Sequence, residues 1–374
     1  MASDFPILCI LESRPEDAIL SSGLLRKLHE EIPQATFTLV GSDASAPLFR
    51  DMPNLEDLLV IEGDGSGERF KLWNRVRERK WGLVVDLRGA NFSGWLSRRK
   101  RAERKPWPKG EPIPHKVIQA AHVLQVQDDP PGPWLYTDAE TEAEVDAFLE
   151  AHAKPGDGPI LAIGPGSDWI GKTWQAERFA KVAGTLLGPD GPMSDGRLLI
   201  VGADDDREAV HSIRVTVSRE RVIEAQGKLD RLQTCALLKR CRFYVGNDSI
   251  WTHLATAAGI PVLGVFGPSD ETLEGPWGPG RMAVRGPKSM DDFRRHDPKL
   301  NQTINHMYDV PIDTVVAAAL KLYAETEPGA VAAPAPVAEA AEADSAEAED
   351  LEAAAVEAED VAPEIETEDA DPGA

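Results

Sequence analysis

The chain has 374 residues, 42% of them apolar, and a formal net charge of −23 at pH 7. This length favours two domains, and the apolar fraction suffices for a hydrophobic core in each. The three cysteines (Cys9, Cys235 and Cys241) lack ligand-like spacing, and no apolar run approaches roughly twenty residues. A disulfide scaffold and a transmembrane segment are therefore disfavoured, and we expect a cytoplasmic protein.

Much of the negative charge lies at the C-terminal end. Residues 325–374 contain 17 acidic residues and no Lys or Arg, so the first 324 residues carry a net charge of only −6. With one Leu and one Ile, this segment cannot bury enough apolar surface to offset the entropy of ordering it. The sequence predicts a disordered acidic tail that either solubilises and spaces the protein or contains a specific binding motif.

The first 154 residues alternate between strand-like and helix-like patterns. Strands are expected at 7–11, 36–40, 58–61 and 81–89, and helices at 16–30 and 68–80. This alternation is typical of an open, doubly wound α/β domain. Asp17 begins the first helix at the carboxyl edge of the first strand, where such domains bind ligands. It could also simply complement the helix dipole.

A strongly basic segment follows these elements. Its cations are Arg98, Arg99, Lys100, Arg101, Arg104, Lys105 and Lys109. Such a run usually forms a solvated helix face. It could also bind an anionic acceptor or anionic lipid headgroups. Nucleic acid is disfavoured because no known nucleic-acid-binding module accompanies the basic residues.

The connection to the second half has little periodicity. Residues 110–136 are rich in Pro and are expected to be irregular, whereas Thr137 and Glu140 predict a capping box opening a helix to about residue 152. Residues 154–159 indicate a Pro/Gly linker. We therefore expect an N-terminal domain over 1–154 and a C-terminal domain over 155–324.

The second half repeats the alternation. Strands are expected at 160–163, 198–201, 222–225, 243–245 and 262–266, and helices at 176–187, 229–239 and 312–324. The loop 164–174 is rich in glycine, so its backbone can approach a ligand closely. Lys172 and Thr173 offer a cation and a hydroxyl to phosphate oxygens, although the spacing is not that of a Walker A loop.

Residues 241–270 form a strand, a tight turn, a helix that Gly259 ends, and another strand. Such a unit makes a right-handed crossover and brings its polar loops to the carboxyl edge of a parallel sheet. The amides from Ser249 onward could bind a diphosphate, and Asp248 could accept hydrogen bonds from sugar hydroxyls. Alternatively, Asn247 and Asp248 only cap the helix.

Several short motifs occur together in register. They are G-P-G-S at 164–167, K-T-W-x-x-E-R-F at 172–179, V-G-A-D-D-D-R-E at 201–208, V-G-N-D-S-x-x-x-H-L-A at 245–255 and F-G-P-S-D at 266–270. In this series the chain resembles the glycosyltransferase family 9 heptosyltransferases, which transfer ADP-heptose onto the lipopolysaccharide inner core. The N-terminal half is similar through Asp17 and through D-L-R-G at 86–89. The resemblance implies a GT-B fold, with two doubly wound Rossmann-like α/β domains facing a cleft.

The resemblance also implies roles for individual residues. Asp17 would be the catalytic base, and Asp248 would hold the transferred sugar. The other donor-side residues would be Lys172 and Thr173 at the phosphates, Asp206 at the ribose, and Ser249, Ile250, Trp251 and His253 around the diphosphate cradle, with His253 either packing the helix or contacting the ligand. The acceptor-side residues would be Arg88, Arg98, Arg99 and Arg101.

The implied reaction is an inverting displacement at the anomeric carbon, with a base on one face and a stabilised diphosphate on the other. Neither a metal nor another cofactor is expected, because Lys172 and helix amides can take the negative charge. A nucleotide-diphosphate sugar would be the co-substrate. The acceptor would be an anionic lipid-linked glycan, which predicts peripheral contact with the cytoplasmic face of the inner membrane.

Two other functions remain open at this point. Glu16 and Ile250 stand where the family usually has glycine, which leaves a non-catalytic sugar-nucleotide or glycan-binding homologue as the main alternative. A sugar-nucleotide epimerase of the same architecture is less favoured because the motifs match transferases.

Overall fold

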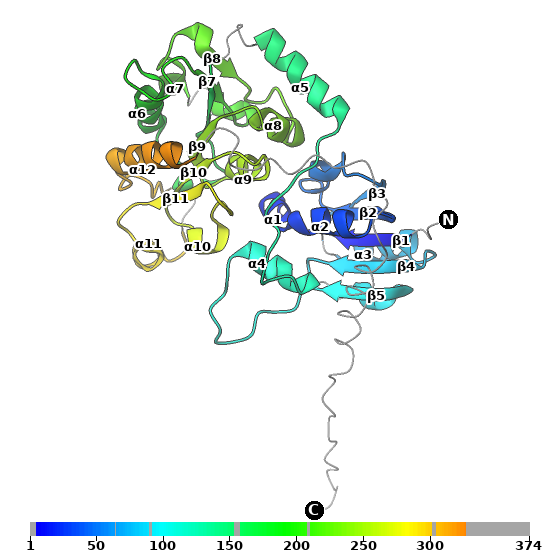
Figure 1. Cartoon of the computed structure of the whole chain (residues 1–374). Helices are drawn as coiled ribbons and strands as arrows, with labels where there is room; N and C mark the ends of the chain where they lie inside the picture. Colours follow the sequence, from blue (N-terminus) through cyan, green and yellow to red (C-terminus); the bar gives the residue numbers. More distant parts are fainter. Residues whose placement is uncertain are drawn as a thin grey trace, which may run out of the picture.

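The computed structural model describes residues 5–63, 65–89, 92–152, 158–207, 210–300 and 304–326. These residues form two parallel sheets, one in each half of the chain (Figure 1). The first sheet contains, in spatial order, β3 (Leu55–Val60), β2 (Ala35–Gly41), β1 (Phe5–Ile10), β4 (Trp81–Asp86) and β5 (Arg98–Glu103). The second contains β11 (Arg281–Arg285), β10 (Val262–Phe266), β9 (Phe243–Asn247), β6 (Ile160–Gly164), β7 (Arg197–Ile200) and β8 (Val222–Glu224).

Burial explains which strands lie at the centre of each sheet. Every residue of β4, β6, β9 and β10 is buried, because these strands are covered by helices on both faces. The edge strands β3 and β5 instead mix exposed and partly buried residues. The charged sequence RRKRAE can form a strand in β5 because only one of its edges pairs, with β4.

Helices cover both faces of the first sheet, as in a doubly wound fold. The helices of this half are α1 (Pro15–Ser21), α2 (Gly23–Glu31), α3 (Ser66–Val76) and α4 (Lys116–Ala121), with 3-10 turns η1 (Ala46–Phe49), η2 (Ser93–Trp95) and η3 (His122–Leu124). The next helix in the chain, α5 (Ala139–His152), lies beside the second sheet (Figure 1). The buried side chains of α1, α2 and α4 pack on one face of the first sheet. Leu72 and Val76 of α3 pack on the opposite face.

The single helix expected over 16–30 is broken at Ser22. Its hydroxyl donates to the carbonyl of Ile19 (2.6 Å) and accepts from the backbone N–H of Trp134 (2.8 Å). At the next position, a Cβ on Gly23 would stand 2.4 Å from the carbonyl oxygens of Pro131 and Gly132. The break therefore lets the 131–134 segment pack tightly against the helix pair, a long-range contact that the local periodicity did not reveal.

Three further expectations for this half are wrong. The basic segment from Arg98 is an edge strand and not a helix face. The stretch 110–136 is not wholly irregular, because it contains α4 and η3. Finally, Asp138 and not Thr137 caps α5: its carboxylate accepts from the N–H of Thr141, whereas the hydroxyl of Thr137 bonds the side chain of Glu142.

The second sheet is also covered on both faces. Its helices are α6 (Ala176–Leu187), α7 (His211–Arg214), α8 (Arg231–Leu238), α9 (Ile250–Ala257), α10 (Glu271–Glu274), α11 (Met290–His296) and α12 (Ile312–Glu325), with 3-10 turns η4 (Ile170–Lys172), η5 (Asp204–Arg207) and η6 (Arg219–Arg221). The apolar faces of α6, α7 and α12 pack on one face of the sheet, and those of α8 and α9 on the other.

A shared hydrophobic layer joins the two halves. Helix α1 contacts α9, and one continuous cluster of buried side chains spans both sheets. The expected architecture of two doubly wound α/β halves is confirmed. The predicted boundary at 154/155 and the tail beyond Thr326 lie outside the described residues.

Candidate active site

A buried ion pair lies at the carboxyl edge of the second sheet. Asp248 follows β9, and its Oδ2 stands 3.0 Å from Nζ of Lys172 in the loop after the neighbouring strand β6. The two side chains are 4% and 14% exposed. Burial acts to lower the pKa of Lys172, but Asp248 and then Asp168 raise it above its ordinary value. Lys172 therefore stays protonated, and Asp248 balances its charge while no anion is bound.

Asn247 fixes the glycine-rich loop to the sheet. Its Oδ1 accepts from the backbone N–H of Trp174 (2.9 Å), and its Nδ2 donates to the carbonyl of Pro165. Asn247 therefore clamps both ends of the loop and does not cap α9. Ser249 occupies the N-cap position, but no side-chain hydrogen bond from a described residue caps the helix. The first amides of α9 thus keep their capacity to bind an anion.

The remaining donor-side residues surround this loop. The hydroxyl of Thr173 lies 2.9 Å from that of Ser167, so a hydrogen bond joins two separate positions of the loop. The Asp206 carboxylate accepts from the N–H of Ala203 (2.9 Å) and packs so close to Gly166 that a Cβ there would stand 2.2 Å from its Oδ2. The structure thus brings Asp206 to the glycine loop, although its contact with a ribose stays a prediction.

Ile250 and Trp251 lie on the apolar side of α9. Ile250 is buried in the hydrophobic layer between the two sheets, and Trp251 packs against the same layer. Both side chains therefore contribute to packing at the junction of the halves. Any direct contact of these two side chains with a ligand stays a prediction.

A second charged cluster connects the two halves. Asp17, in the first turn of α1, places its Oδ1 2.6 Å from Nζ of Lys116, and the same Nζ lies 2.6 Å from Oε1 of Glu274. Lys116 opens α4 in the N-terminal half, whereas Glu274 ends α10 in the C-terminal half. The three side chains are 20–24% exposed. Asp17 is thus linked to the opposite half through one lysine.

The sequence did not identify Lys116 or Glu274. Both lie in short helices, and the stretch around Lys116 was expected to be irregular. The signal that could have found Lys116 is its position beside His115, whose Nδ1 accepts from the N–H of Val117 and begins the helix. A histidine in that capping role is uncommon, because Ser, Thr, Asp and Asn are the usual N-cap residues.

His115 makes the second link across the junction. Its Nε2 lies 3.0 Å from the carbonyl oxygen of Gly275, and its ring packs against Trp277 with 4.6 Å between the ring centroids. Burial lowers the pKa of His115. With Nδ1 accepting from Val117, the neutral ring donates from Nε2 to Gly275.

His253 is a buried histidine on α9 that both charged clusters influence electrostatically. It is 2% exposed on α9, and burial lowers its pKa to about 4, against the opposing influence of Asp248, Glu274 and Asp17. All three carboxylates therefore lie within electrostatic range of one neutral imidazole. Helix α1, which carries Asp17, contacts α9, which begins just after Asp248.

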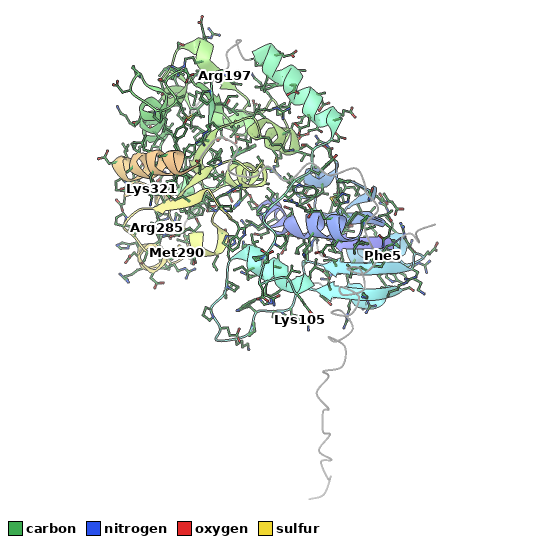
Figure 2. The ribbon with its side chains drawn as sticks, viewed as in Figure 1. Phe5, Lys105, Arg197, Arg285, Met290 and Lys321 are labelled. Carbon is green, nitrogen blue, oxygen red and sulfur yellow. The ribbon has the colours of Figure 1, made fainter. Side chains whose placement is uncertain are left out.

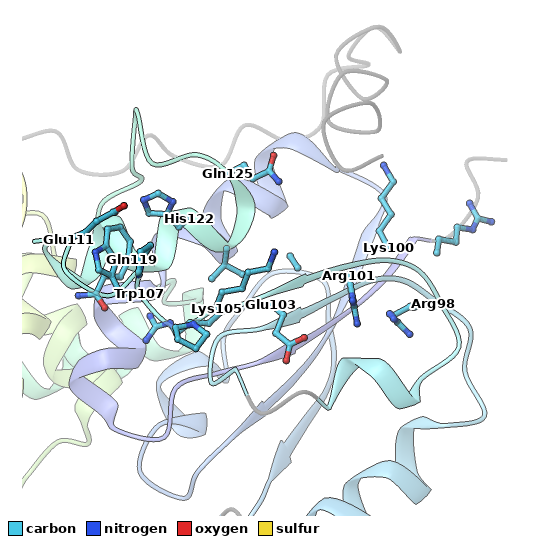
Figure 3. A pocket seen from close by; sticks show the side chains of 16 residues that line it. Arg98, Lys100, Arg101, Glu103, Lys105, Trp107, Glu111, Gln119, His122 and Gln125 are labelled. Atoms are coloured by element: carbon cyan, nitrogen blue, oxygen red, sulfur yellow. The ribbon is translucent and has the colours of Figure 1, made fainter. Parts of the chain in front are cut away.

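The acceptor-side arginines occupy two separate places. Arg88, at the carboxyl end of β4, donates from Nε to the carbonyl of Leu11 (2.6 Å), close to the strand that leads to Asp17. Arg98 lies at the opposite, amino end of β5, where it pairs with Trp81. It does not reach Asp17. Arg98, Arg99 and Arg101 instead line a cavity of about 680 Å³ that continues toward Trp107 and His122 (Figure 3).

The described residues offer neither a cluster of metal-ligating side chains nor a helix that could cross a membrane. No group of three or more His, Cys, Asp or Glu side chains in the described part of the chain could hold a metal ion. None of the described helices has both the length and the apolar character needed to cross a bilayer.

Comparison with known proteins agrees with this geometry. The profile of "Glycosyltransferase family 9 (heptosyltransferase)" matches residues 69–303. Lipopolysaccharide heptosyltransferase 2 of Escherichia coli K12 is 24% identical over 306 residues, covering 72% of this chain and 85% of its own. An E. coli lipopolysaccharide heptosyltransferase 3 is 26% identical over 352 residues, covering 84% and 98%.

Solved structures show the same fold. A family 9 glycosyltransferase from Veillonella parvula superposes with a TM-score of 0.66 at 20% identity, over 87% of this chain and 99% of its own. The E. coli ADP-heptose lipopolysaccharide heptosyltransferase II gives 0.65 at 19% identity, over 86% and 99%. These likenesses confirm the GT-B arrangement. Because the family profile covers more than half of the sequence, the chain belongs to glycosyltransferase family 9 and is a glycosyltransferase.

Proposed function

We propose that this glycosyltransferase transfers a heptose-like sugar from a nucleotide-diphosphate donor to a lipopolysaccharide-type or other anionic glycan acceptor. The names of its relatives support heptose and lipopolysaccharide as the substrate classes. One structural observation carries the proposal. Asp17 on α1 and the Lys172–Asp248 pair come from opposite halves of the chain, and α1 contacts α9, the helix that begins just after Asp248.

The donor would bind on the C-terminal half. Lys172 and the first amides of α9 would hold the diphosphate, because a paired ammonium and unpaired N–H groups both stabilise phosphate charge. Asp248 would accept hydrogen bonds from the sugar hydroxyls. Asp206 and Thr173 would complete the nucleotide side from the glycine-rich loop.

The reaction would proceed with inversion. Asp17 would take the proton of an acceptor hydroxyl while the acceptor oxygen bonds the anomeric carbon and the bond from that carbon to the diphosphate breaks. Lys116, whose Nζ lies 2.6 Å from Oδ1 of Asp17, would hold the carboxylate in position for this step. Lys172 and the α9 amides would receive the charge that develops on the leaving group. These groups can perform the step without a metal ion or another cofactor.

The acceptor would lie along the N-terminal half. Arg88 and Arg104 stand at the carboxyl edge of the first sheet, where Arg104 pairs with Glu12 at 2.5 Å. The cavity lined by Arg98, Arg99 and Arg101 would bind negatively charged groups farther along the acceptor. The same cations would support peripheral contact with the anionic, cytoplasmic face of an inner membrane.

The decisive experiment replaces Asp17 by Asn. The change keeps the size of the side chain but removes the base, so transfer should fall by about 10²–10⁴-fold. Donor affinity, measured by calorimetry, should stay within a few-fold. Near-normal turnover in Asp17→Asn would exclude Asp17 as the base. If the native protein is stabilised by nucleotide sugars but transfers to no acceptor, the non-catalytic alternative is correct.

A further inference from the structure

Strand β5 and the residues after it concentrate positive charge on a negatively charged protein. Residues 98–109 contain seven Lys or Arg and one acid, a net charge of +6, so the rest of the first 324 residues carries −12. Charged side chains on an edge strand often serve only to prevent pairing with another sheet. Here, however, the basic run continues beyond the strand and lines a cavity, called here the β5 groove, of about 680 Å³.

The cations of the β5 groove differ in how far the described residues neutralise them. Arg104 has Glu12 as its partner. Arg99 and Arg101 are exposed, and no carboxylate of the described residues lies within ion-pair distance of either. Figure 3 shows Arg98, Lys100 and Arg101 at one end of the groove and Trp107 and His122 at the other. The groove thus has the charge and shape to accept an extended anionic chain.

We propose that the β5 groove binds the acidic C-terminal segment of the same chain, residues 327–374. This segment contains 16 acidic residues and no Lys or Arg. Its charge complements the groove and is repelled by the remaining, net negative surface. Charge complementarity therefore favours one site on the protein for the segment.

The segment is long enough to reach the groove. It starts beyond Thr326, whose carbonyl and hydroxyl are held by Arg242 at the end of α12. Figure 2 shows Lys321 of α12 and Lys105 of the groove on different halves of the molecule. The 48 residues of the segment can span at most about 160 Å. A folded body of this size has a radius of gyration of only about 20 Å.

Tethering makes even weak binding effective. A linked segment reaches a local concentration on the order of 1 mM, so a dissociation constant of about 1 mM fills half of the grooves. The contact should weaken with salt, because the Debye length falls from about 8 Å at 0.15 M to about 3 Å at 1 M ionic strength. If the proposed function is correct, the segment competes there with the anionic acceptor and raises the acceptor KM.

Zero-length coupling of carboxylates to lysines tests the contact on the full-length protein without an activity assay. A carbodiimide at low ionic strength should join the acidic segment to Lys100, Lys105 and Lys109 within one chain, with a yield that does not change on dilution. Reversing Arg99 and Arg101 to Glu should lower this yield by about tenfold. The matched control reverses two exposed arginines elsewhere, Arg219 and Arg294, and should leave the yield unchanged.

Several outcomes would overturn the proposal. The groove is not the binding site if the coupling is spread over lysines outside it. The same conclusion follows if coupling survives the Arg99/Arg101 reversal in a variant with a normal melting temperature. Yields that rise with protein concentration would assign the contact to a second copy. Coupling abolished by vesicles containing anionic lipid supports a shared anion site, whereas coupling unaffected by 1 M salt contradicts it.

The competition is tested with a full-length variant in which the 16 acids are replaced by Gln and Asn. Its acceptor KM should fall by about twofold for half-filled grooves and up to about tenfold for nearly filled ones, at constant kcat. An unchanged KM despite groove-specific coupling would refute the competition. A native protein that shows the coupling but transfers no sugar would refute the proposed function and leave the contact standing.

Discussion

The two charged clusters beside α9 are built in different ways. Lys172 and Asp248 leave neighbouring strands of one sheet and meet at 14% and 4% exposure. Asp17, Lys116 and Glu274 come from three helices in both halves and remain 20–24% exposed. The first cluster is part of the edge of a folded sheet, whereas the second is complete only when Glu274 of the C-terminal half meets Lys116. We therefore expect the donor side to be rigid. The arrangement around Asp17 should depend on contact between the two halves.

Removing one partner of the buried pair should have the largest effect. Lys172→Met leaves Asp248 buried without its cation, so the free energy of unfolding should fall by about 3–5 kcal/mol in urea titrations. The matched control is the double variant Lys172→Met/Asp248→Leu, which removes both charges and should recover part of the loss. If the double variant is as unstable as Lys172→Met, the loss of stability does not come from an unpaired Asp248.

The burial of neutral His253 predicts that stability depends on pH. Burial lowers its folded-state pKa to about 4, below the ordinary value of 6.5, so the unfolded chain binds a proton first as the pH falls. The contribution of neutral His253 is complete above pH 6.5 and is lost toward pH 4, a decrease of roughly 3 kcal/mol in unfolding free energy. His253→Gln should flatten the profile in this window. An equally steep profile in that variant would assign the acid sensitivity to other groups.

Lys116→Met should have the smallest effect on stability and a large effect on transfer. The cluster is partly exposed, so the loss in unfolding free energy should be about 1 kcal/mol. Turnover should nevertheless fall by at least about tenfold, because Asp17 loses its positioning contact. Glu274→Gln is the control that weakens only the contact across the junction. If Lys116→Met leaves kcat unchanged, the bridge is structural and does not orient the base.

Much of the second half could be predicted, because its signals are local. The predicted strand 160–163 and helix 176–187 agree with β6 and α6 almost residue for residue. Asp248 and Lys172 were recognisable because each lies in a short motif directly after a strand, and parallel strands bring such loops together. The role of Asn247 was misjudged, because a clamp between two loops has the same local sequence as a helix cap.

The sequence by itself determined the central strands and longer helices of both halves, the charged segments and the family motifs, since these depend on residue spacing along the chain. Only the tertiary structure decided that Lys116 meets Asp17 across 99 positions, that His115 reaches Gly275 across 160, and that the basic run pairs as an edge strand. The physical reason is that these contacts join short, weakly patterned segments. Their positions are set by the packing of the two halves and not by any local preference.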